Sequence, residues 1–117
     1  MKMKDYKSEI MIEDKKYILY FNLNVMEQIQ EEYETVEKWG ALTDGKSGEV
    51  NAKALIFGLT AMLNEGIEIE NEETGIEKPL LTKKQVGRLI TKLGIEESAN
   101  QMNKAIVEST KSDEKNE

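Results

Sequence analysis

The chain has 117 residues, 38% of them hydrophobic and 33% charged, which is enough for one domain with a single modest core. It contains no cysteine and no histidine, so disulfides, cysteine nucleophiles and most zinc sites are excluded. A formal net charge of −7 argues against a nucleic-acid binder, and no apolar run approaches the roughly 18 residues of a membrane span. We therefore expect an acidic cytoplasmic protein without nucleic-acid or membrane partners.

Residues 8–23 are predicted to form a β-hairpin. In the segment KYILYFNL, residues 16–23, side chains alternate with the period of two that is typical of a strand. The preceding EDKK is a plausible turn, although it lacks the glycine that the tightest turns favour, so the turn type stays open. A lone hairpin is marginal in water, and one face should therefore lie on helices.

The rest of the chain predicts helices. Asn24, with Glu27 three residues later, is expected to cap an amphipathic helix over 25–39. A glycine-punctuated loop over 40–49 should lead to a second helix over 51–65, ended by Gly66.

An acidic loop should follow up to residue 78. Thr82 and Gln85 form a capping box for a third helix over 82–93, which Gly94 ends, and a fourth helix is expected over 96–109. The predicted fold is therefore α+β: one domain over 1–110, with an N-terminal hairpin and a bundle of about four helices, then a disordered polar tail over 111–117.

The stretch GALTDGKS, residues 40–47, matches the phosphate-binding pattern G-x-x-x-x-G-K-[ST]. That pattern binds phosphate only when a strand precedes it and a helix begins at the Lys-Ser pair. Here an amphipathic helix is predicted before Gly40, and Gly48 and Glu49 follow the Lys46-Ser47 pair. We interpret the stretch as an ordinary loop and expect no cofactor.

Other chemistry-bearing patterns are weak. The acidic stretch over 68–77 does not meet the EF-hand spacing, so no metal site is expected. Neighbouring glutamates such as Glu31 and Glu34 lie in charge-rich surroundings where nothing would separate their pKa values. We predict no catalytic residues and no enzyme activity.

The second helix, over 51–65, is apolar nearly all round. One broad face suits the core, while the opposite side carries a strip of small residues next to an aromatic ring. Such a strip either lies centrally in the core or meets a partner. If the chain has a partner-binding surface, we expect it at Ala54, Phe57, Gly58 and Ala61.

Taken in order, the segments YFNLNVMEQIQEEYETVEKW, KALIFGLTAMLNEG and LLTKKQVGRLITKLG resemble the tail assembly chaperones of long-tailed phages and prophages of Gram-positive bacteria. The resemblance covers roughly residues 8–95. It implies a protein that binds the long tape measure protein and keeps it soluble while tail tube subunits polymerise, and that is absent from the finished virion.

Under this resemblance the partners would be the tape measure protein and also the tail tube protein, and a homo-oligomer would be compatible with an apolar helix face. Two other hypotheses stay open. One is a small structural or adaptor protein of a phage or prophage without a chaperone role. The other is a nucleotide-dependent enzyme that uses residues 40–47.

Overall fold

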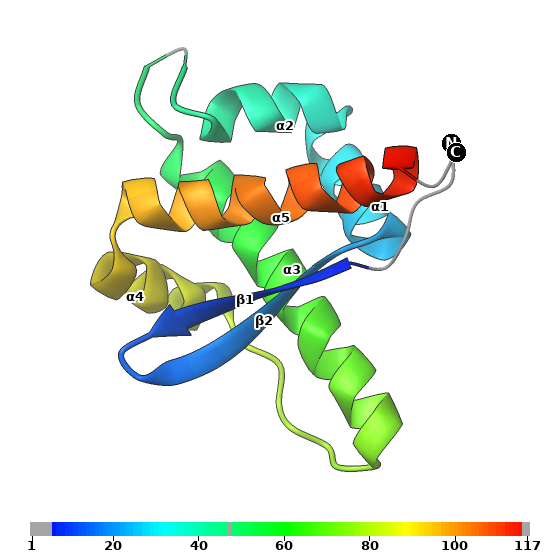
Figure 1. Ribbon diagram of the computed structural model, residues 1–117. Helices are drawn as coiled ribbons and strands as arrows, with labels where there is room; N and C mark the ends of the chain where they lie inside the picture. Colours follow the sequence, from blue (N-terminus) through cyan, green and yellow to red (C-terminus); the bar gives the residue numbers. More distant parts are fainter. Residues whose placement is uncertain (1–5, 47, 116–117) are drawn as a thin grey trace.

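The structure is a computed structural model, and it describes residues 6–46 and 48–115. A two-stranded antiparallel hairpin is followed by five helices, so the fold is α+β and mostly helical (Figure 1). The elements are β1 (Tyr6–Ile12), β2 (Lys15–Phe21), α1 (Leu23–Tyr33), α2 (Val36–Thr43), α3 (Ala52–Thr74), α4 (Lys83–Leu93) and α5 (Ile95–Lys115).

The hairpin closes through a two-residue turn. Glu13 and Asp14 both have positive φ, 49° and 67°, the pattern of the type I′ turn that matches the twist of a hairpin. Ile10 pairs with Tyr17 across the strands and Ser8 pairs with Leu19, so these residues share one face. The buried strand residues Ile10, Ile12, Leu19 and Phe21 all belong to that face, which lies on the helices as expected.

The predicted single helix over 25–39 is wrong, because the chain breaks at Glu34 and Thr35. Glu34 ends α1 with a positive φ of 73° and a ψ of −51°, outside the helical regions. Thr35 Oγ1 then accepts a hydrogen bond from Lys38 N at 3.0 Å to begin α2. Lys38 also donates to the Glu34 carboxylate, which holds the pKa of that carboxyl below its usual value. The break turns α2 so that Trp39 faces α3.

The first helix is capped by Asn22 and not by Asn24. Asn22 Oδ1 accepts a hydrogen bond from Val25 N at 3.2 Å, and Leu23 is already helical. Asn24 lies in the first turn and uses its side chain to reach Glu65 on α3. The predicted N-cap lies two residues too far along the chain, because both asparagines have a side chain suited to capping.

The second predicted helix extends much further than residue 65. Gly66 lies inside α3, and the helix stops at Gly75, whose φ is 76°. A Cβ on Gly66 would stand 2.8 Å from Ile18 O, so this glycine allows β2 to lie close against α3. The acidic stretch predicted as a loop is therefore helical up to Thr74.

Two asparagines of α3 hold the segment that returns from its end to α4. Asn64 exchanges two hydrogen bonds with the backbone of Leu81, and Asn71 exchanges two with the backbone of Lys78, all at 2.8–3.0 Å. In Figure 1 this segment runs back alongside the far end of α3. It places the first turn of α4 next to α3.

The C-terminal helices follow their local signals. The capping box of Thr82 and Gln85 is present, and Gly94 ends α4, as predicted. Helix α5 begins at Ile95 and runs to Lys115, so residues 111–115 are helical and not the disordered tail that was predicted. Residues 116–117 lie outside the described residues.

Trp39 is the largest fully buried side chain, and it occupies a slot on α3. Its Nε1 donates to Ala54 O at 2.9 Å, and its ring lies over Gly58, one helical turn later. A Cβ at position 58 would overlap Trp39 Cζ2 and stand 3.1 Å from Met102 Sδ. Helices α2, α3 and α5 therefore meet at the position without a side chain.

We predict that Gly58→Ala lowers the free energy of unfolding by about 1–3 kcal/mol, because an added methyl group in a filled core displaces its neighbours. Gly40→Ala is the matched control, since Gly40 is also helical but a Cβ there meets nothing within 4 Å. It should be neutral or stabilising by up to about 1 kcal/mol. Urea unfolding of both variants measures the two changes. Equal changes in the free energy of unfolding would contradict the close packing of Trp39 on Gly58.

Candidate functional site

The GALTDGKS stretch does not form a phosphate-binding loop. Gly40 lies within α2, so a helix and not a strand precedes the loop. Asp44 Oδ1 accepts a hydrogen bond from Lys46 N at 2.8 Å, which uses a backbone amide that the motif would direct at phosphate. Helix α3 begins only at Ala52, and Ser47 lies outside the described residues.

Neither a metal-binding cluster nor a membrane-spanning helix is found in the described part of the chain. Among the side chains that the structure describes, up to residue 109, no three acidic groups are arranged to hold a metal ion. Among the same residues, no helix is both long and apolar enough to cross a membrane. The remaining candidate sites are two hollows on the surface.

The four residues predicted as a partner-binding face do not share one exposed surface. Ala54, Gly58 and Ala61 are buried, and the first two are covered by the indole of Trp39. The strip of small residues is therefore a packing surface for α2 and α5, which corrects the expectation. Phe57 is the exception: it is only partly buried and faces a different part of the surface.

Phe57 lies in a hollow between α1, α3 and α4, here named the apolar hollow. Its volume is about 510 Å³, within the range of roughly 300–1,000 Å³ that is common for small-ligand pockets. Its apolar lining consists of Tyr33, Ile56, Phe57 and Gly87, and its charged rim consists of Glu32, Lys53, Lys83 and Lys84.

Two aromatic rings stiffen this hollow. The rings of Tyr33 and Phe57 meet edge to face, with centres 5.6 Å apart and an angle of 75°. The Tyr33 hydroxyl is buried and has no hydrogen-bond partner among the described residues. Burial raises the pKa of Tyr33, and the Glu32 carboxylate adds to the rise, so this hydroxyl stays protonated near neutral pH.

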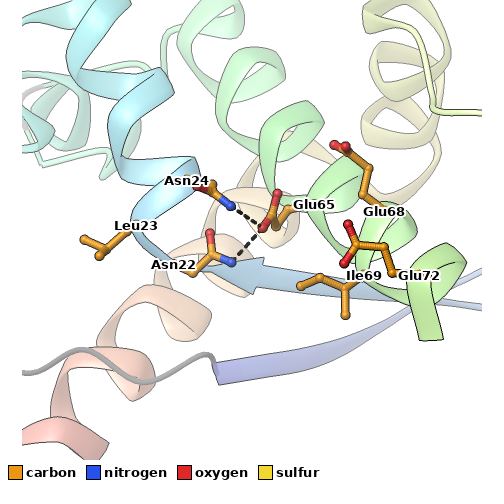
Figure 2. A pocket seen from close by; sticks show the side chains of 7 residues that line it. All are labelled: Asn22, Leu23, Asn24, Glu65, Glu68, Ile69 and Glu72. Atoms are coloured by element: carbon orange, nitrogen blue, oxygen red, sulfur yellow. Dashed lines mark hydrogen bonds between the residues drawn. The ribbon is translucent and has the colours of Figure 1, made fainter.

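A second hollow has the opposite chemistry and is named the acidic hollow. It measures about 350 Å³ and lies where β2 passes into α1 beside α3 (Figure 2). Three carboxylates of α3 line it together with the start of α1, and the residues are Asn22, Leu23, Asn24, Glu65, Glu68, Ile69 and Glu72. Figure 2 shows Asn22 and Asn24 both directed at Glu65.

Glu65 is the buried carboxylate of the acidic hollow, and it is hydrogen-bonded within the protein. It is only 8% exposed, and its Oε2 accepts hydrogen bonds from Asn22 Nδ2 at 2.8 Å and from Asn24 Nδ2 at 3.0 Å. Asn22 also caps α1 with its other side-chain atom. Glu65 thus ties the end of the hairpin and the start of α1 to the middle of α3.

Sequence reasoning found Phe57 but not the residues around it. In the sequence Tyr33 and Ile56 are ordinary apolar positions of amphipathic helices, and the rim lysines follow no pattern. They come together because α1 and α4 both pack against α3, and the asparagine contacts help to return α4 to it. Family models, curated proteins and solved structures give no match to this chain.

We predict that Glu65→Ala lowers the free energy of unfolding by about 1–3 kcal/mol, because two amide donors lose their acceptor. Glu65→Gln should cost less, since its amide oxygen can still accept. Glu68→Ala, an exposed position in the same hollow, is the control and should change little. If thermal unfolding shows all three variants alike, Glu65 does not fasten α1 to α3.

Proposed function

We propose that this protein is a tail assembly chaperone that binds the tape measure protein and keeps it soluble while tail tube subunits polymerise around it. The observation that carries the proposal is the apolar hollow at Phe57, an apolar surface that is open to solvent between three helices of an acidic protein. The chain's order of hairpin, helices, acidic segment and capped helix, and its resemblance to these chaperones, point the same way.

The shape of the apolar hollow suits a helical client. A helix can lay an apolar face into a groove between other helices, with one large side chain as its anchor. Rigid aromatic residues supply much of the affinity in such contacts, and Tyr33 and Phe57 hold each other in place here. Gly87 adds no side chain on the α4 side and leaves room for an incoming residue.

The charge of the chain suits the same role. A net charge of −7 keeps a crowded assembly soluble and discourages unwanted contacts between copies. In this proposal the protein acts in the cytoplasm of the bacterial host, meets the tail tube protein during assembly, and is left out of the finished particle.

We predict that the chain co-purifies with the longest helical protein encoded by its neighbouring genes and keeps it soluble when the two are co-expressed. Phe57→Glu should abolish both effects, because it places a charge in the apolar hollow. Gly87→Glu tests the same surface without removing a packed side chain, since a Cβ at that position makes only an ordinary 3.6 Å contact with Ile56.

Ile95→Glu serves as the control, because Ile95 is 49% exposed and lies outside the hollow. Circular dichroism of each variant verifies that the fold is kept. Precipitation of the long protein with and without the wild-type chain would contradict the chaperone role. A small structural or adaptor protein would then be the better account, and the chain should be found in purified particles.

A further inference from the structure

The rim of the apolar hollow is positively charged although the chain is acidic. Three ammonium groups, from Lys53 on α3 and from Lys83 and Lys84 on α4, stand around it with a single carboxylate, Glu32. The acidic hollow on the same molecule carries three carboxylates and no cation. The two hollows therefore differ in the sign of the charge around them.

Among the side chains that the structure describes, none of the three rim lysines has an acidic partner within ion-pair distance. The ion pairs seen between described side chains, which exclude those of residues 110–115, use Lys16, Lys38, Lys78 and Lys92. Lys53, Lys83 and Lys84 are all exposed. An incoming carboxylate would thus meet free ammonium groups and would not have to displace an existing pair.

Lys83 is also placed with respect to the apolar floor. Its Nζ lies 5.4 Å from the centre of the Phe57 ring, within the distance at which a cation is attracted to an aromatic face. The ammonium group therefore stands over the same ring that an apolar anchor would contact. The first turn of α4, which carries Lys83 and Lys84, adds the partial positive charge of a helix N-terminus.

We infer that the apolar hollow takes a helical segment in which one large apolar side chain is flanked, a turn away on either side, by carboxylates. The apolar side chain lies on Tyr33, Ile56 and Phe57. The carboxylates face Lys53 from one side and the α4 lysines from the other, because residues three or four apart share a helix face. This rests on the proposed function in taking the client as the partner, and it adds which client segments are bound.

The test uses the full chain and labelled helical peptides of about 20 residues, long enough to form a helix in the groove. One peptide carries a central leucine flanked by glutamates one turn away, and a second carries lysines at the flanking positions. A third keeps the glutamates but has alanine at the centre. Fluorescence anisotropy at low and raised salt gives the affinity of each peptide.

We expect the glutamate-flanked leucine peptide to bind about tenfold more tightly than either of the others, and its advantage over the lysine peptide to shrink as salt screens the charges. Changing the three rim lysines to glutamine should lower its affinity by a similar factor. The matched control changes three exposed lysines elsewhere that take part in none of these ion pairs, with the same effect on net charge: Lys7, Lys46 and Lys104.

Equal binding of the glutamate and lysine peptides would overturn the inference, as would equal effects of the rim and control variants. Self-association that the rim variant removes would assign the hollow to a second copy and also overturn it. If the long helical protein co-purifies but the rim variant binds it unchanged, the chaperone role stands and the charge selection fails. If the glutamate peptide binds selectively but the long protein does not co-purify, the selection stands and the chaperone role fails.

Discussion

The indole of Trp39 lies on Gly58 of α3, a position without a side chain at which α2, α3 and α5 meet. Its ring fills the space over Gly58, and its Nε1 donates to Ala54 O. Because α2 has to present this ring to α3, the chain cannot continue α1 as one straight helix, and it breaks at Glu34 and Thr35. Met102 of α5 closes the same place from another side. The helical part of the molecule is arranged around this contact.

This packing decides which face of α3 remains at the surface. Ala54 and Gly58 are covered by α2, so the strip of small residues on α3 lies in the interior. Ile56 and Phe57 turn away from it and, together with Tyr33 of α1 and the first turns of α4, form the apolar hollow. In the middle of the helix Glu65 fastens the end of the hairpin, and an acidic hollow lies beside it. One long helix thus carries two surface hollows of opposite chemistry.

Features that depend on local signals could be predicted from sequence. The hairpin followed from alternation, and the start and end of α4 followed from its capping box and from Gly94. Features that depend on tertiary contacts could not. Glycine often ends a helix, but Gly66 lies inside α3, where its lack of a side chain allows the close approach of β2. Phe57 could be picked as a surface residue, whereas the α4 lysines of its rim reach it only through the packing of α4 on α3, to which the Asn64 and Asn71 contacts contribute.

The proposed chaperone role requires that the client contact the surface between α1, α3 and α4. Site-specific photo-cross-linking tests it most directly, with a benzophenone amino acid placed at Lys84 on the rim or at Lys104 on α5, both exposed. Irradiation during co-expression with the long helical partner should link the partner to position 84 and not to position 104. Cross-links that form from position 104 alone would place the client on another face and contradict the account.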